Sequence, residues 1–229
     1  MIPGKQIRSV LFDMDNTLFD FVLAQQTACR AVLYRNGQDG DPERLFTYFR
    51  RQVHGFEHHD NIRDFLIDTG AFSDHDFALC CQIYETEKVA AIEPYPGIVG
   101  ILESLRKQKV PLGIITDADA AHAAVRLERA GLSRFFATIV TPDRSGAAKP
   151  DPASFLLALD ELGVEPGETV LAGDSIRRDI APAQNLRMVT VYAQYGDSYW
   201  PAGTDSCTPD YVARTVSELG IVLNGLTEE

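Results

Sequence analysis

Short apolar runs, separated by amphipathic segments, fill the second half of the chain and also occur near its start. Five of these runs are rich in β-branched or aliphatic residues and predict strands, at Ile7–Asp13, Val110–Thr116, Ala137–Thr141, Thr169–Gly173 and Met188–Tyr192. Helical patterns lie between the later strands, at Ile98–Lys109, Ala120–Ala130, Pro152–Leu162 and Ile176–Asn185. This alternation predicts an α/β fold, in which a parallel sheet carries helices on both faces.

The segment that follows the first predicted strand has a different pattern. Residues 19–93 show no convincing strand pattern, and glycines separate four helical stretches, at Phe21–Arg35, Pro42–His54, Asn61–Asp68 and Ser73–Ala90. We therefore expect a small all-α domain at residues 19–93. It would be inserted into a Rossmann-like α/β core made of residues 1–18 and 94–229.

Charge and composition narrow the range of partners. The chain has a formal net charge of -12 and a pI near 4.8, which argues against nucleic acid or an anionic membrane as the main partner. No apolar run has the length of a membrane span, and the N-terminal run ends in acids, unlike a signal peptide. We expect a soluble cytoplasmic protein. The four cysteines lack metal-ligand spacing and are interpreted as reduced packing residues.

Polar side chains follow four of the predicted strands. They are Asp13 and Asp15 after the first strand, Thr116 and Asp117 after the second, Lys149 after the third, and Asp174 and Asp179 after the fourth. In open α/β sheets, ligands bind beyond the carboxyl ends of the strands. The sequence therefore predicts that these side chains converge at one edge of the sheet.

The residue types in this group suit the chemistry of a phosphate ester. Closely spaced acids repel one another, and Mg²⁺ bound by the oxygens of Asp13 and Asp174 would offset that repulsion. Lys149 and Thr116 offer a positive charge and a hydrogen bond to the same anion. One carboxylate can attack phosphorus while its neighbour transfers protons, so that no histidine or serine base is needed.

Four segments in this order and spacing, "DMDNT", "IIT", "KPDPASF" and "GDSIRRD", closely resemble the four motifs of the haloacid dehalogenase superfamily. They are most similar to its phosphatases that carry a helical cap after the first strand. The resemblance covers about Val10 to Val212. It implies a Mg²⁺-dependent phosphatase acting on a small phosphorylated metabolite, with residues 19–93 as the cap.

The resemblance also implies a role for each motif residue. Asp13 would be the nucleophile that forms an aspartyl-phosphate, and Asp15 would protonate the leaving oxygen and then activate water. Mg²⁺ would be held by Asp13, by Asp174 and by the backbone carbonyl of Asp15. Thr116 and Lys149 would bind the phosphoryl group. Asp179 would support the metal site or Lys149.

Several questions stay open at this point. Asp117 stands where relatives commonly have asparagine, and its role is undetermined. The alternatives are a phosphomutase, a hydrolytic 2-haloacid dehalogenase and a catalytically silent regulatory relative. The substrate could be phosphoglycolate, a nucleoside monophosphate or a sugar phosphate, and the oligomeric state is undetermined. In "HGFEHHDNIRDF", His58 and His59 are interpreted as part of a solvated helix end, and Arg63 is the candidate for substrate contact.

Overall fold

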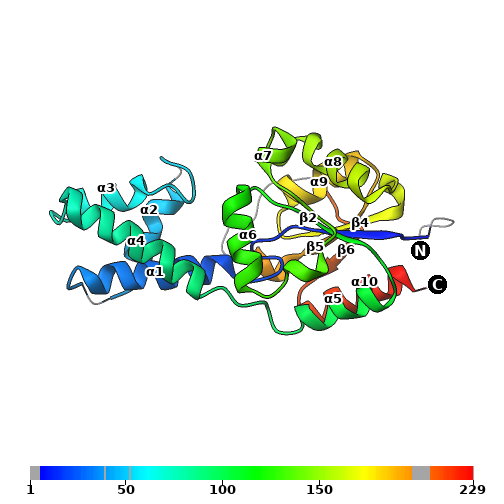
Figure 1. Cartoon of the computed structure of the whole chain (residues 1–229), viewed down its shortest axis with the longest axis horizontal. Helices are drawn as coiled ribbons and strands as arrows, with labels where there is room; N and C mark the ends of the chain where they lie inside the picture. The colour runs from blue at the N-terminus through cyan, green and yellow to red at the C-terminus, as the bar shows by residue number, and fades with distance from the viewer. Residues whose placement is uncertain (1–5, 39, 52, 198–206, 229) are drawn as a thin grey trace. The chain divides into compact units, whose positions relative to one another are not determined.

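The computed structural model describes residues 6–38, 40–51, 53–197 and 207–228 (Figure 1). The chain divides into two compact units, one formed by Met1–Asp20 with Glu93–Glu229 and the other by Phe21–Ile92. The boundaries expected from the sequence differ from these by one or two residues. Phe19 belongs to the first unit because it pairs through β-bridges with both Asp15 and Pro94.

The first unit is built on a six-stranded sheet with the order β3-β2-β1-β4-β5-β6, in which every pair is parallel. The strands are β1 (Ser9–Phe12), β2 (Leu112–Ile115), β3 (Thr138–Val140), β4 (Thr169–Gly173), β5 (Val189–Ala193) and β6 (Tyr211–Ala213). In the central strand, Val10 pairs with Leu112 on one side and Val170 on the other. Strand β1 is buried throughout, which explains its continuous apolar run. The predicted α/β fold is confirmed.

Helices cover both faces of this sheet. They are α5 (Ile98–Lys107), α6 (Ala120–Arg129), α7 (Pro142–Ser145), α8 (Pro152–Leu162), α9 (Ala181–Asn185) and α10 (Val216–Thr227). Figure 1 shows α8 and α9 on one face and α5 and α10 on the other. Helix α8 begins with Pro152 after an Asp151 cap that accepts from the Ala153 N–H. It ends at Leu162 and is followed by the cap residue Gly163, whose φ of 64° suits glycine. Its Phe155 and Leu159 pack on the sheet core.

Two parts of the first unit differ from the sequence-based expectation. The predicted helix Ile176–Asn185 opens with a wider π-type turn at Ile176–Ile180, because the amides of Asp179 and Ile180 both donate to the Ser175 carbonyl. Strand β6 and helix α10 were not predicted. The start of α10 carries a recognisable signal, since the Thr215 hydroxyl accepts from the Glu218 N–H as an N-cap.

The second unit is helical, with α1 (Phe21–Arg35), α2 (Glu43–Arg50), α3 (Asp60–Asp68) and α4 (Asp74–Ala90). Helices α1 and α4 lie side by side, and the rings of Phe49 and Tyr84 stack 4.9 Å apart within the unit. The expected helix Pro42–His54 ends early, at Arg50. In the described parts of the chain, no helix combines the length and the apolar character needed to cross a membrane.

Candidate active site

Asp13 leaves the central strand and is held by two side chains. Its carboxylate Oδ1 accepts from the Lys149 ammonium, and its Oδ2 accepts from the Thr17 hydroxyl at 3.2 Å. The Asp13 amide continues the sheet by donating to the Ala172 carbonyl at 2.9 Å. Asp13 is 5% exposed, so these contacts fix a carboxylate that is almost completely buried. Thr17 was not singled out by the sequence analysis.

Lys149 joins two of the predicted acids. Its ammonium also donates to Asp179 Oδ1 at 2.7 Å, while Asp179 Oδ2 accepts from the Ser175 N–H at 2.9 Å. Burial alone would lower the pKa of Lys149, but Asp13, Asp179 and Asp117 together raise it above its usual range. Lys149 therefore stays charged. Asp179 contacts Lys149 and also belongs to the group of acids described next, so both of its predicted roles stay predictions.

Asp174 is the acid without such a partner. It is 1% exposed, and its Oδ1 is buried with no hydrogen-bond partner among the residues that the structure describes. Burial, Asp13 and Asp179 raise the pKa of Asp174 well above its usual range. One carboxylate oxygen from each of these three acids lies within 4.8 Å of the others.

This donor set fits a hard divalent cation. All three groups offer carboxylate oxygens, which Mg²⁺ prefers, and the buried Oδ1 of Asp174 needs a positive neighbour. At this edge of the sheet, Lys149 pairs with Asp13 and Asp179, Arg126 with Asp15, and Arg178 with Asp117. Asp174 adds a further acid to this group, which a cation would stabilise.

Each carboxylate oxygen of Asp117 has a hydrogen-bond partner. Its Oδ1 accepts from the backbone N–H of Lys149 at 2.8 Å, and its Oδ2 pairs with Arg178 at 3.0 Å. The arginine therefore offsets the charge that an acid introduces at this position. Thr116, one residue earlier, is buried, and its hydroxyl accepts from the Ala118 N–H at 3.1 Å. Its phosphate-binding role stays a prediction.

Asp15 is paired with a residue that the sequence analysis missed. Arg126 from α6 donates to Asp15 Oδ2 at 2.7 Å, and the arginine side chain is 1% exposed. The signal was present in the sequence, because Arg126 shares a helix face with the buried Ala123 and Leu127. A charged side chain on an apolar face usually has a buried partner.

Two glycines make room for this arrangement. A Cβ on Gly173 would lie 2.6 Å from the Cβ of Asp179, and one on Gly196 would lie 2.0 Å from the carbonyl oxygen of Asn16. Any larger residue at either position would displace the acids or the loop after β1. Tyr195, next to Gly196, also contacts the loop after β1, since its hydroxyl donates to the Thr17 carbonyl at 2.7 Å.

Arg63, the predicted substrate contact, lies in the second unit. Its Nε is 3.1 Å from Asp60 Oδ1, and its guanidinium lies 4.4 Å from the centre of the Phe77 ring. The substrate role of Arg63 stays a prediction.

Comparison with known proteins identifies the family. The sequence profile of the haloacid dehalogenase-like hydrolases matches residues 7–187, most of the chain and all of the acids described above. The chain belongs to this family. It is 30% identical to the glyceraldehyde 3-phosphate phosphatase of Methanopyrus kandleri over 233 residues, which span 97% of this chain and 100% of that protein.

Two further comparisons agree with this assignment. The phosphoglycolate phosphatase of Neisseria meningitidis is 28% identical over 220 residues, which cover 94% of this chain and 93% of that protein. The crystal structure of a haloacid dehalogenase phosphatase from Thermococcus onnurineus is 26% identical and superposes with a TM-score of 0.64, covering 96% of this chain and 99% of that one. The predicted family is confirmed.

In this haloacid dehalogenase-like hydrolase, Arg126 is expected to position Asp15. Arg126→Met should lower kcat about 10- to 100-fold with little change in KM, because Asp15, the predicted proton donor, would lose its fixed orientation. Arg126→Lys, which keeps the charge, should retain more activity. The loss should be larger for an alkyl phosphate than for p-nitrophenyl phosphate, whose leaving group needs no proton in the first step.

Arg129→Met provides the matched control, since Arg129 is exposed on the same helix. Thermal unfolding of each variant would separate positioning from folding. An equal loss on both substrates by Arg126→Met would show that the arginine supports the fold and does not position the acid.

Proposed function

We propose that this protein is a Mg²⁺-dependent phosphatase that hydrolyses a small phosphomonoester through an aspartyl-phosphate. The observation that carries the proposal is Asp13, fixed by Lys149 and Thr17 beside Asp174, whose buried Oδ1 has no hydrogen-bond partner among the described residues. The relatives named as phosphatases for glyceraldehyde 3-phosphate and for phosphoglycolate support a phosphate ester of two or three carbons as the substrate.

The proposed reaction has two steps that use the chain's own residues. First, a carboxylate oxygen of Asp13 bonds to phosphorus, the ester P–O bond breaks, and Asp15 gives its proton to the leaving oxygen. Second, water attacks the same phosphorus while Asp15 takes up its proton, and the bond from Asp13 to phosphorus breaks. The products are an alcohol and inorganic phosphate. Lys149 offsets negative charge on the phosphoryl oxygens throughout.

Asp13 and Asp174, with the backbone carbonyl of Asp15, would hold Mg²⁺ in this proposal. When bound, the ion would offset the charge of the acids and of the phosphoryl group. Asp179 would support the site indirectly, since its two oxygens already accept from Lys149 and Ser175. The helical unit would act as the cap that selects the substrate.

Release of inorganic phosphate from a panel of esters tests this proposal. The panel would contain glyceraldehyde 3-phosphate, phosphoglycolate, a nucleoside monophosphate and glucose phosphates, with 2-chloropropionate as the haloacid. We expect phosphate release from the smallest esters and no halide. Halide release without phosphate would support the dehalogenase alternative, and isomerised sugar phosphate without free phosphate would support the mutase alternative.

Metal removal should abolish the activity. After dialysis against EDTA, we expect at least a 100-fold lower rate that Mg²⁺ restores, because no divalent cation would then offset the charges of Asp13, Asp174 and the phosphoryl group. Asp174→Asn should lower Mg²⁺ affinity, so that excess Mg²⁺ partly rescues it. Lys149→Met should not be rescued, since it removes a phosphate contact. Equal rescue of both variants would mean that these two roles are wrongly assigned.

A further inference from the structure

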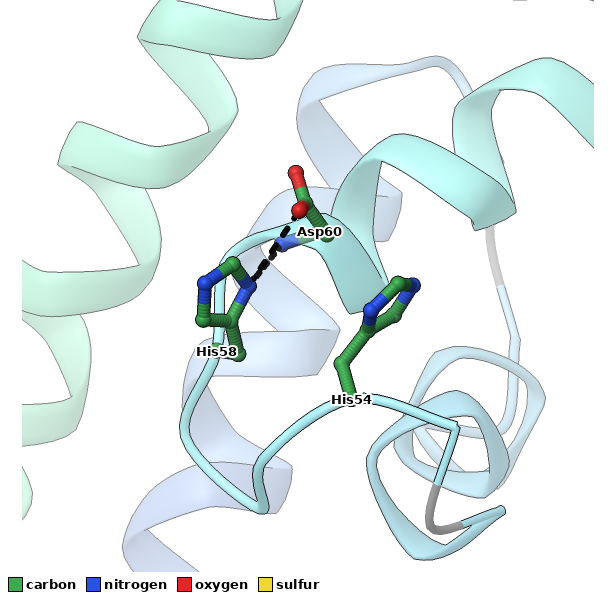
Figure 2. A group of neighbouring side chains, drawn as sticks. All are labelled: His54, His58 and Asp60. Atoms are coloured by element: carbon green, nitrogen blue, oxygen red, sulfur yellow. Dashed lines mark hydrogen bonds and ion pairs between the residues drawn. The ribbon is translucent and has the colours of Figure 1, made fainter.

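A second group of metal-ligating side chains lies in the helical unit. His54, His58 and Asp60 come from the loop between α2 and α3 and from the first residue of α3, and Figure 2 shows them around one turn of the backbone. One ligand atom from each lies within 4.8 Å of the others. The group shares no residue with the candidate active site.

The hydrogen bonds of the two histidines determine which ring nitrogen is available. Nε2 of His54 lies 3.1 Å from Asp64 Oδ2, and since a carboxylate only accepts, this nitrogen carries the proton. Nδ1 of His58 accepts from the backbone N–H of Asp60 at 3.2 Å, so this nitrogen carries a lone pair. A neutral His54 ring therefore presents Nδ1 as its metal-binding atom, whereas a metal ion at Nδ1 of His58 would have to replace the hydrogen bond from the Asp60 N–H.

The carboxylate behind His54 is itself fixed. Asp64 Oδ2 also accepts from Arg51 at 2.8 Å, which holds the acid in place. A metal-binding histidine commonly donates its second nitrogen to a carboxylate in this way, and the contact sets the orientation of the ring. The contact with Asp64 thus fixes the orientation of the His54 ring, as such contacts do for metal-binding histidines.

The loop that carries the histidines is also held in shape. Asn61 is completely buried, and its side-chain amide donates to the carbonyls of Gly55 and His58, each at 2.9 Å. This anchoring also explains why α2 does not continue to His54, as the sequence had predicted. A loop fixed from within loses little conformational freedom when it binds a ligand.

We propose that His54, His58 and Asp60 bind a divalent transition-metal ion, with Zn²⁺ as the reference case. Two imidazoles and one carboxylate suit Zn²⁺ and leave a fourth position for water, whereas Mg²⁺ and Ca²⁺ prefer oxygen ligands. Bonds of about 2.0–2.1 Å place tetrahedral ligands about 3.3 Å apart. Side-chain rotations that move the ligand atoms by about 1 Å would therefore close the site.

Asp60 would contribute its Oδ2, which lies 3.5 Å from Nδ1 of His58. Its Oδ1 is already paired with Nε of Arg63 at 3.1 Å, and this neighbouring positive charge weakens the attraction for a cation. We therefore expect a site with one carboxylate oxygen and a dissociation constant in the micromolar range, weaker than that of a four-ligand structural zinc site.

Zinc titration by calorimetry tests the proposal on the full, tag-free chain with millimolar Mg²⁺ present to occupy the acids of the active site. We expect one equivalent of Zn²⁺ to bind, and binding to weaken at least tenfold in His54→Ala and in His58→Ala. His75→Ala is the matched control, because His75 is exposed on α4 in the same unit. Asp64→Asn should weaken binding about 10- to 100-fold without removing a ligand.

Two results would overturn the proposal. The first is equal Zn²⁺ affinity in the wild type and His58→Ala, which is informative because His58 is exposed and its loss leaves the Asn61 contacts intact. The second is an equal loss in His75→Ala, which would indicate general surface binding. Histidine ring NMR signals provide an independent readout, since the signals of His54 and His58 should shift on addition of Zn²⁺ and that of His75 should not.

Discussion

Asp13→Asn is expected to lose phosphatase activity by about four orders of magnitude or more on every substrate. Because an amide oxygen is a poor nucleophile, no aspartyl-phosphate should form. A substrate with a good leaving group should therefore not restore the activity. The substitution keeps the size of the side chain but leaves only one oxygen in place of the two that accept from Lys149 and Thr17. Steady-state phosphate release from p-nitrophenyl phosphate and from the natural ester would measure the loss.

Folding is the necessary control for this variant. Asp13→Asn removes one of several closely spaced negative charges, so its thermal stability should equal or exceed that of the wild type. Asp151→Asn is a suitable matched variant, because Asp151 is an exposed N-cap of α8 and asparagine caps a helix equally well. Activity of Asp13→Asn within tenfold of the wild type would rule out Asp13 as the nucleophile.

The acids of the candidate site could be placed from the sequence because their position follows from backbone topology. Parallel strands end at one edge of the sheet, and β1 lies directly beside β4, so Asp13 and Asp174 must come close together. Continuous apolar runs marked the buried strands. The helix α8 was also predictable to its ends, since Pro152 and Gly163 are strong terminal signals.

Side-chain pairs between distant elements could not be placed in this way. Arg126 and Asp15 are 111 positions apart, and only the packing of α6 brings them together. The role of Asp117 was left open because an acid stands where relatives commonly have asparagine, and its partner Arg178, 61 positions away, could not be inferred from the sequence. Helical periodicity predicts which face is buried, but it does not predict which residue of another element that face meets.

The loop before α3 shows a related limit. Its sequence has three histidines and one acid, Glu57, and its end at His58 and His59 was interpreted as a solvated helix end. In the structure, the buried Asn61 folds this loop back on itself and brings His54 towards His58. Hydrogen bonds from one buried side chain to the loop backbone, and not a spacing pattern, group these ligands.

Asp15→Asn is expected to behave differently from Asp13→Asn and to trap the phosphorylated enzyme. Its first function, protonation of the leaving oxygen, is dispensable for p-nitrophenolate, which leaves without a proton. Its second function, activation of water, has no substitute in the substrate. With p-nitrophenyl phosphate, the variant should therefore form the aspartyl-phosphate faster than it hydrolyses it. On an alkyl phosphate ester, both steps should be slow.

Rapid mixing would show the difference as a burst of nitrophenolate, at most about one equivalent per active site, followed by a slow steady state. The trapped protein should carry phosphate that is stable to acid and labile to hydroxylamine, as expected for an acyl phosphate on Asp13. The substitution also deprives the buried Arg126 of its charged partner, so folding and Mg²⁺ binding must be measured first. If both are intact and neither burst nor phosphoenzyme is seen, Asp13 and Asp15 do not divide the reaction as proposed.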